Sequence, residues 1–486
     1  MKRKHHQSPR TKDVIISSLI AFALLLACLF ACDNADGSLS SVGTSPGKTG
    51  QSSGNSELAE TEPDYSWFEM PDETGTLTVY GTGLANLTLT PASALFSELY
   101  PDVKVEITAA NSDSLEERLR TEIAAGKGPD LIVFSDVIFP DIMKTMATGV
   151  FTDLAPYFAL DPEISISDFV PGVMDCGLLE GKRFLVPLSY NMPVLFTSRS
   201  LLASLGAEPE DLMTFEGFLS VAARFREVYP GQPLDLDTNL VDAPYINELR
   251  PLWIGFGFSC IDYEKNEVCL DRDLFHDYID LLKPDYVEDY KDHDPEMDYK
   301  HSGNYWTYKG IQMRECLYTS WANGFRGFIE AKEELSKGGD EAVPFLLPGI
   351  DGSVSASAYY YTAIPRGAEN PLNGWRMMKV LLSEELQTAD DINGNSALSG
   401  TPVLRSAIRN RVEKDAVKYR GWGYRFGDDL VEEYIAFYET PAKLRLTPSI
   451  LLKYVREEMT PYWKENKSFD TCWDSLIDMV ELYKDE

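Results

Sequence analysis

The early part of the chain sets the fold class, because strand and helix patterns alternate along it from Thr76 onward. Three segments are β-prone, the last of them a continuous apolar run suited to a buried parallel strand: 76–80, 103–107 and 131–134. Between them, residues 91–99 and 114–125 carry apolar side chains at helical spacing. This β-α-β-α-β order predicts an α/β fold with a parallel sheet covered by helices on both faces.

Small and polar residues follow two of these strands directly. In open α/β sheets, ligands bind beyond the carboxyl ends of the strands. The first strand ends at Tyr80 and leads to Thr82, and the third leads to Ser135 and Asp136. We therefore expect these four residues to lie near a bound ligand.

The N-terminus has the pattern of a secretory signal. Residues 1–12 are basic, and residues 14–31 are almost entirely apolar. Cys32 follows Ala31, as in the lipoprotein box of bacteria, so we expect Cys32 to be lipidated after cleavage; Cys28 is a second possible position. An uncleaved membrane anchor is the alternative, since about 20 apolar residues can span a bilayer. Either reading places the rest of the chain outside the cytoplasm.

Composition and charge narrow the remaining possibilities. Residues 33–74 are rich in Ser, Gly, Thr and acidic residues, which predicts a flexible tether. With 486 residues, of which 44% are hydrophobic, the chain can form two or three domains. The formal net charge of −33 argues against nucleic acid as a partner, because nothing balances phosphate repulsion.

The sequence gives little support for catalysis, a cofactor or a metal. It contains no HExxH, P-loop or CxxC pattern, and no GxSxG elbow between a strand and a helix. The acidic segment 292–298 lacks the glycine and terminal glutamate of an EF-hand loop, so we interpret it as solvated. Cys260 and Cys269 flank a hairpin pattern, which leaves a cross-strand disulfide or two separate thiols open.

The later part of the chain alternates extended segments and helices. Residues 181–196 indicate two strands around a Pro-broken middle, as in a crossing between domains. Thr214 is a suitable N-cap for a helix over 215–228. Residues 355–364 indicate a strand, and residues 372–383 a helix.

In this order, the segments resemble the extracellular solute-binding proteins of ABC importers, in the sugar-binding class that includes maltose-binding protein. The segments that carry the resemblance are 96–105, 124–134, 149–154, 181–196, 363–387, 400–403 and 468–486. Such a protein has two α/β lobes that close on a ligand about a hinge. The resemblance implies a first lobe of 75–187 plus 345–363 and a second of 188–344 plus 364–486. It also implies a monomer that works with the membrane subunits of an ABC permease and needs no cofactor.

A sugar site needs aromatic faces together with amide and carboxylate groups. From strand ends and crossings, the candidates for ligand contact are Tyr80, Thr82, Ser135, Asp136, Tyr190, Asn191, Trp253, Trp321, Tyr359 and Tyr360. We expect an oligosaccharide-binding protein without catalytic activity. A secreted carbohydrate-active enzyme with two catalytic carboxylates, or a ligand-binding partner of a membrane sensor, is the alternative.

Overall fold

The computed structural model describes residues 74–82, 85–110, 113–135, 138–139, 141–192, 194–230, 234, 253, 255–283, 317, 319–320, 324–337, 339–446 and 448–486. The expectations for the signal segment with Cys32, for the tether, and for Asp136 and Trp321 lie outside these residues. Among the described residues, no helix is both long and apolar enough to cross a membrane.

The largest sheet of the described residues has five strands in the order β2-β1-β3-β14-β6. These are β1 (Gly75–Thr82), β2 (Val103–Ala110), β3 (Leu131–Phe134), β14 (Tyr361–Ala363) and β6 (Val186–Pro187). β1 pairs in parallel with both β2 and β3, which confirms the predicted parallel unit. β14 lies antiparallel between β3 and β6, so the late segment of the chain completes the early sheet.

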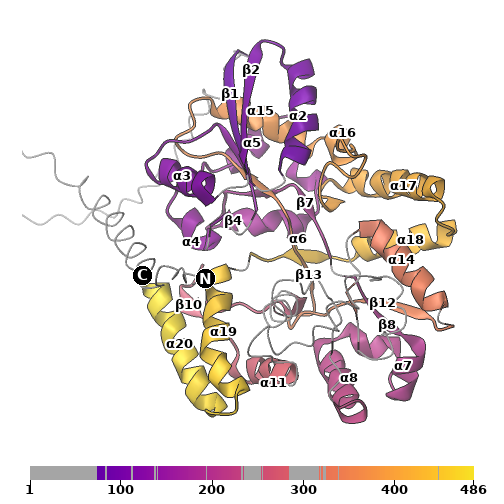
Figure 1. Cartoon of the computed structure of the whole chain (residues 1–486). Coiled ribbons are helices and arrows are strands. Elements are labelled where there is room, and N and C mark those ends of the chain that lie inside the picture. The colour runs from indigo at the N-terminus through magenta and orange to yellow at the C-terminus, as the bar shows by residue number, and fades with distance from the viewer. Residues whose placement is uncertain are drawn as a thin grey trace, which may run out of the picture. The chain divides into compact units, whose positions relative to one another are not determined.

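Helices α2 (Asn86–Leu99) and α15 (Pro371–Leu382) pack together beside this sheet (Figure 1). α15 also contacts β1 and β3, and its Trp375 is almost completely buried. The Trp375 indole donates a hydrogen bond of 2.8 Å to Asp161, which ends α5 (Ala155–Leu160). This packing differs from the expectation that everything after residue 363 lies in the second lobe.

Shorter elements complete the region around the sheet. Two of its helices begin with a clear local signal: Asp141 caps α4, and proline occupies the first turn of α6. The elements are α3 (Asp113–Ala124), α4 (Ile142–Ala147), η3 (Ile166–Asp168), α6 (Pro171–Met174), η4 (Asp175–Gly177), β4 (Leu178–Leu179), β5 (Lys182–Arg183), α16 (Glu384–Gln387), α17 (Arg405–Trp422) and α18 (Asp428–Glu439). Their buried side chains join those of the sheet in one hydrophobic cluster, the first core.

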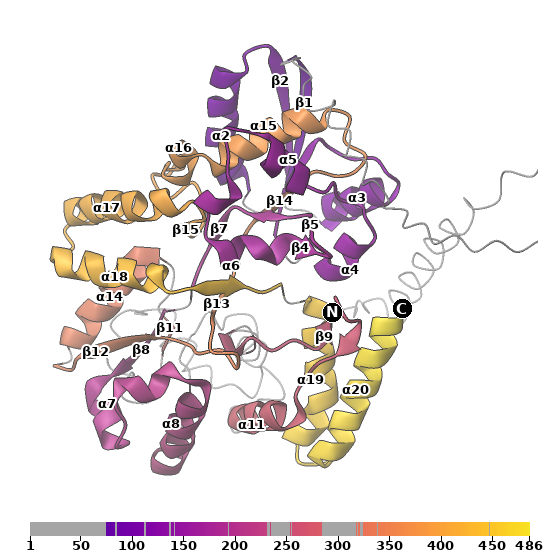
Figure 2. The same cartoon turned by 180° about the vertical axis from the view of Figure 1, so that it is seen from behind.

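Extended segments connect this region to the rest of the chain. β7 (Ser189–Tyr190) pairs with β15 (Thr401–Pro402), and Asn191 then forms an isolated bridge with Ser357. β8 (Val194–Ser198) pairs with β11 (Thr319–Ser320) and β12 (Ala342–Leu346). A parallel pair, β13 (Val354–Ala356) with β16 (Ala442–Leu444), runs nearby (Figure 2). Residues 181–196 are thus extended, as predicted, but they form β5, β6, β7 and the start of β8 where two strands were expected.

The second hydrophobic cluster, the second core, is built mainly from helices and aromatic rings. Its helices are α7 (Arg199–Ser204), η5 (Pro209–Met213), α8 (Phe215–Val228), α11 (Arg272–Leu282), α19 (Ser449–Trp463) and α20 (Phe469–Asp485). The buried residues of α14 (Gly324–Lys337) belong to the first core, and α14 also contacts β8 and β12. The Thr214 hydroxyl accepts a hydrogen bond of 3.1 Å from Gly217, so the predicted N-cap and the limits of α8 are confirmed. Helices α19 and α20 run side by side (Figure 1).

The predicted hairpin forms from β9 (Ile261–Asp262) and β10 (Glu267–Val268). Cys269 donates a backbone hydrogen bond of 2.9 Å to the Cys260 carbonyl, but both cysteines are free thiols. Cys260 is buried and Cys269 is exposed. Of the two possibilities for this pair, the structure shows separate thiols.

Candidate functional site

Three of the predicted ligand-contact residues line one cavity of about 430 Å³: Asn191, Tyr359 and Tyr360. All three come from the crossing segments. The Tyr359 side chain is 47% exposed, whereas Tyr360 is buried. The cavity therefore offers one open aromatic side chain beside one that is held within the wall.

Hydrogen bonds at the crossing hold Asn191 in place. Its backbone N–H donates to the Ser357 carbonyl at 2.7 Å, and the Ser357 N–H donates to the Asn191 carbonyl at 2.9 Å. Gly400 lies directly against it with a φ of 136°. A Cβ at Gly400 would lie 3.1 Å from the Asn191 amide group and 3.0 Å from the Tyr190 carbonyl oxygen. Only glycine fits this approach without strain.

The other walls come from late helices and from the loop before β15. The sequence analysis missed these lining residues: Gly324, Phe325, Asn395, Ser396, Leu398, Ser399, Gly400, Thr401, Pro402, Arg411, Val412, Asp415, Tyr419 and Tyr434. They include three aromatic rings and several amide, hydroxyl and carboxylate groups. One signal for them was present in the sequence: an Arg and an Asp four residues apart, a spacing at which ion pairs form on a helix.

That pair, Arg411 and Asp415 of α17, is the strongest polar feature of the cavity wall. Arg411 is 4% exposed and binds the Asp415 carboxylate in a bidentate manner, with nitrogen–oxygen distances of 3.0 and 2.6 Å. It also donates to Asp390 at 2.9 Å. Burial lowers the pKa of Arg411, but the two carboxylates outweigh this and raise it overall. Arg411 is therefore a charged, fixed group whose hydrogen bonds are used within the protein.

Buried tyrosines lie in the cavity wall and behind it. The Tyr434 hydroxyl donates to Tyr438 at 3.1 Å, and burial raises the pKa of both phenols. Tyr190, a predicted ligand contact, meets Tyr438 edge-on with ring centroids 5.7 Å apart. Tyr190 is 1% exposed and does not line the cavity. The structure thus places Tyr190 in the packing that supports the site.

Three predicted residues lie at the carboxyl edge of the first sheet but not in the cavity wall: Tyr80, Thr82 and Ser135. Tyr80 is half-buried, and its hydroxyl accepts a hydrogen bond of 3.2 Å from Arg118. Thr82 is fully buried, with no hydrogen-bond partner for its hydroxyl among the described residues. Ser135 is half-buried directly after β3. Their contact with a ligand remains a prediction.

Trp253 lies in the second core, so we withdraw its assignment to the ligand. It is 2% exposed, and its ring packs 5.2 Å from Phe258 and 6.0 Å from Tyr278, centroid to centroid. Tryptophan carries a large apolar surface, and burial in an aromatic cluster satisfies that surface without a ligand. An apolar run such as the one around Trp253 is equally consistent with a buried core and with a ring that stacks on a ligand. The sequence pattern alone therefore could not distinguish these two roles for Trp253.

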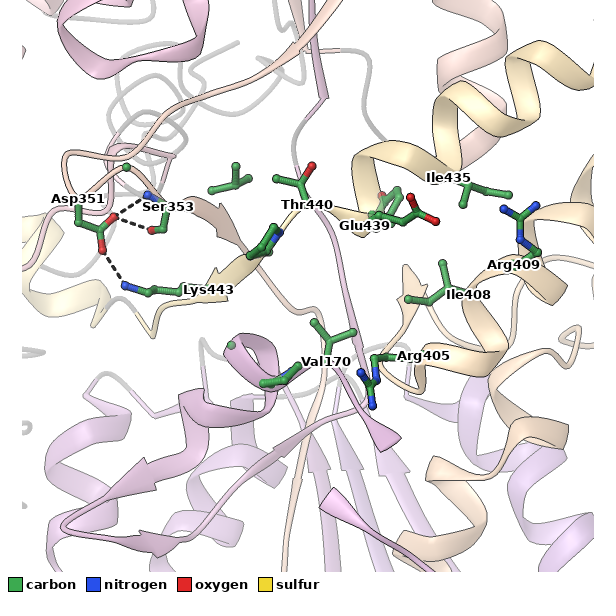
Figure 3. Close-up of a pocket in the computed structure, with 17 residues that line it drawn as sticks. Val170, Asp351, Ser353, Arg405, Ile408, Arg409, Ile435, Glu439, Thr440 and Lys443 are labelled. Carbon is green, nitrogen blue, oxygen red and sulfur yellow. Dashed lines mark hydrogen bonds and ion pairs between the residues drawn. The ribbon is translucent and has the colours of Figure 1, made fainter. Parts of the chain in front are cut away.

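A larger cavity of about 930 Å³ also lies along α17 and α18 (Figure 3). Its wall is mostly apolar, with Val170, Ile408 and Ile435 toward the middle. Three of its charged groups form ion pairs: Lys443 lies 2.9 Å from Asp351, and Arg409 binds Glu432, which is outside the wall. None of the predicted contact residues lines it. We therefore take the smaller cavity, lined by Asn191, Tyr359 and Tyr360, as the candidate site and call it the crossing pocket.

Comparison with known proteins agrees with this architecture. The sequence profile of the bacterial extracellular solute-binding proteins matches residues 82–247, which run from the end of β1 past α8. The chain has the fold of a periplasmic binding protein. The resemblance to extracellular solute-binding proteins, predicted from the sequence, is confirmed by the fold and by the profile match over 82–247. No match was found among curated protein sequences.

Three solved structures illustrate the likeness. The sugar-binding protein MalE of Xanthomonas citri has 18% identity and a TM-score of 0.59, covering 84% of this chain and 97% of its own. The cyclic α-maltosyl-1,6-maltose-binding protein of Arthrobacter globiformis has 15% identity and a TM-score of 0.54, covering 84% and 98%. An ABC substrate-binding protein of Listeria monocytogenes, in complex with cycloalternan, has 12% identity and a TM-score of 0.53, covering 84% and 99%.

The crossing pocket combines what a sugar requires of a binding site. Aromatic rings pack on the C–H faces of a sugar, while amide and hydroxyl groups bond to its hydroxyls. Here Tyr359, Tyr360 and Tyr419 supply rings, and Asn191 and Asn395 supply amides. Cavities of several hundred Å³ with a few convergent polar groups are typical binding sites for small molecules.

Proposed function

We propose that this chain is a lipid-anchored extracellular solute-binding protein that captures an oligosaccharide in the crossing pocket and delivers it to an ABC importer. The protein binds its ligand without converting it. The observation that carries the proposal is the meeting of Asn191, Tyr359 and Tyr360, from crossing segments 168 residues apart in sequence, in a single cavity. The fold of the periplasmic binding proteins supports the same reading.

The chemistry of the pocket favours an uncharged sugar. Arg411 is the one cation among the described lining residues, and carboxylates and backbone carbonyls already occupy it. An acidic sugar would need a free cation in a chain whose formal net charge is −33. The similar structures from Xanthomonas and Arthrobacter are of proteins that bind sugars, which supports this ligand class.

The direct test is a thermal-shift screen of the full-length chain in detergent against neutral and acidic oligosaccharides, peptides and polyamines. A ligand at 100 times its Kd stabilises a protein by about 2.7 kcal/mol, which such a screen detects. We expect a neutral oligosaccharide to raise the melting temperature and to be recovered unchanged. Consumption of the sugar would show an enzyme instead. A response to peptides or polyamines alone would overturn the ligand class.

The anchor needs a separate test, because Cys32 lies outside the described residues. We expect cells fed a labelled fatty acid to label the wild-type chain and the Cys28→Ser variant but not Cys32→Ser. Serine keeps the size of the side chain and removes the thiol that carries the lipid. Loss of label from Cys28→Ser alone would move the anchor to the other cysteine, and an unlabelled, full-mass wild-type chain would show an uncleaved anchor.

A further inference from the structure

A buried carboxylate joins the two cores at a place remote in sequence from the crossing segments. Asp141 is 7% exposed and begins α4, whose Ile142 and Met146 belong to the first core. Its Oδ1 accepts the backbone N–H of Lys144 at 3.0 Å, which caps the helix. Its Oδ2 accepts two further hydrogen bonds, and both donors come from elements packed on the second core.

The two donors are tyrosine hydroxyls. Tyr263 of the β9–β10 hairpin donates to Asp141 at 2.7 Å, and Tyr483 of α20 donates to the same oxygen at 2.7 Å. Tyr263 packs against buried residues of both cores, and Tyr483 packs against the second. The views in Figures 1 and 2 show the hairpin between α4 and α20.

A cation completes the cluster. Lys144 of α4 lies over the Tyr483 ring, 3.7 Å from its centroid, and donates to the Tyr483 carbonyl oxygen. α4 therefore holds α20 through a charge-assisted hydrogen bond and a cation–π contact. Burial and the Asp141 carboxylate raise the pKa of both tyrosines, so both hydroxyls stay protonated and act as donors.

This cluster lies at the same edge of the first sheet as the crossing pocket. α4 follows the carboxyl end of β3, and Phe134, the last residue of β3, pairs with Tyr361 of β14. The pocket residues Tyr359 and Tyr360 directly precede Tyr361. The carboxyl end of β3 thus leads both to the pocket and to the contact between α4, the hairpin and α20.

We propose that Asp141, Tyr263 and Tyr483 form a latch that restrains the hairpin and α20 of the second core against α4 of the first core, and so limits the relative motion of the two cores. The extended crossing segments can act as a hinge. A further contact is therefore needed to restrain the second core against the first. Release of the latch lets α4 separate from the hairpin and from α20.

The test is hydrogen–deuterium exchange on the ligand-free full chain, so its result does not depend on whether any sugar binds. Tyr263→Phe, Tyr483→Phe and the double variant remove only the hydroxyls and keep both rings. We expect the double variant to speed backbone exchange in α4, the hairpin and the end of α20 by about tenfold, because opening of that contact no longer breaks two hydrogen bonds to a charged group. Each single variant should give a smaller increase.

Tyr454→Phe is the matched control. The Tyr454 ring packs 5.7 Å from that of Tyr483, while its hydroxyl is outside the hydrogen bonds of Asp141. Exchange in this control should match the wild type. Unchanged exchange in the double variant would overturn the latch, and so would an equal increase in Tyr454→Phe, which would point to general loosening of α19 and α20.

Discussion

The two cavities along α17 and α18 differ in what lines them, although they share both helices. Arg405, Ile408 and Arg409 of α17 line the larger cavity, whereas Arg411 and Asp415 of the same helix line the crossing pocket. The larger cavity is apolar, with ion pairs around it. The smaller one combines aromatic rings, amides and a buried ion pair. Size alone favours the larger cavity, whereas convergent polar groups, on which recognition depends, favour the crossing pocket.

The sharpest contrast concerns two arginines of α17, and Arg411→Leu has the largest expected effect. This change leaves the Asp415 carboxylate buried without its partner, so we expect a loss of about 3–5 kcal/mol in the free energy of unfolding. Arg409→Leu removes an exposed pair with Glu432 and should leave stability close to that of the wild type. Denaturant unfolding measures the free energy of unfolding of both variants. Equal losses of stability would show that the buried ion pair of the crossing pocket contributes no more than the exposed pair at the larger cavity.

Gly400→Ala tests the tight approach at the crossing pocket. The added Cβ meets Asn191 and the Tyr190 carbonyl at a positive φ, so we expect about 1–3 kcal/mol of destabilisation and weaker ligand binding. Gly394→Ala is the control, since Gly394 also has a positive φ but no atom within 4 Å of the added Cβ. Thermal unfolding of the pair separates steric overlap from backbone strain. If Gly400→Ala loses no more stability than Gly394→Ala, the loop around Gly400 can move to accommodate the added Cβ.

Tyr359→Ala should weaken ligand binding about tenfold while changing stability little, because Tyr359 is 47% exposed and its ring faces the pocket as an aromatic anchor. Lys443→Ala, at the rim of the larger cavity, should leave affinity unchanged. Calorimetric titration with the sugar from the screen measures both. If Lys443→Ala lowers affinity and Tyr359→Ala does not, the ligand occupies the larger cavity.

The smallest effect should come from Asp351→Asn at that rim. Burial raises the pKa of Asp351, but hydrogen bonds from Ser353, Lys443 and Arg445 outweigh it and hold the pKa well below its ordinary value. The carboxylate thus stabilises the fold above about pH 4, and this contribution is lost as the pH falls toward the folded-state pKa. Since the group is largely exposed, we expect a difference below about 1 kcal/mol. The difference in melting temperature between wild type and variant should be larger at pH 7 than at pH 3; a difference that grows in acid would contradict this sign.

The two regions also differ in how far the sequence predicts them. The strands from Gly75 to Phe134 are separated by single helices, so local periodicity was enough to place them and their parallel pairing. The second core depends on aromatic rings from distant segments, such as Phe215 against Phe256 at 4.9 Å. No local pattern shows which rings will meet, and Trp253 was misassigned for that reason.

The same difference explains what was found of the site. Asn191, Tyr359 and Tyr360 were predicted because they lie in extended segments next to proline or at strand ends, where ligand contacts concentrate. Arg411, Asp415 and Tyr419 were missed because they lie on one amphipathic helix among several. The helical pattern indicates which face is buried, but not whether that face meets the core or a cavity.

The place of β14 in the first sheet has a consequence for the order in which the chain can fold during synthesis. β3 is complete once Phe134 has been made, but its neighbour on one side begins at Tyr361. More than two hundred residues must emerge before that edge is covered. Contacts so far apart in sequence form slowly, because the loop between them must be ordered first. The first sheet, which was the easiest part to predict, is thus among the last parts of the protein to be completed. Until then the newly synthesised chain exposes an unpaired strand edge, which can pair with other chains.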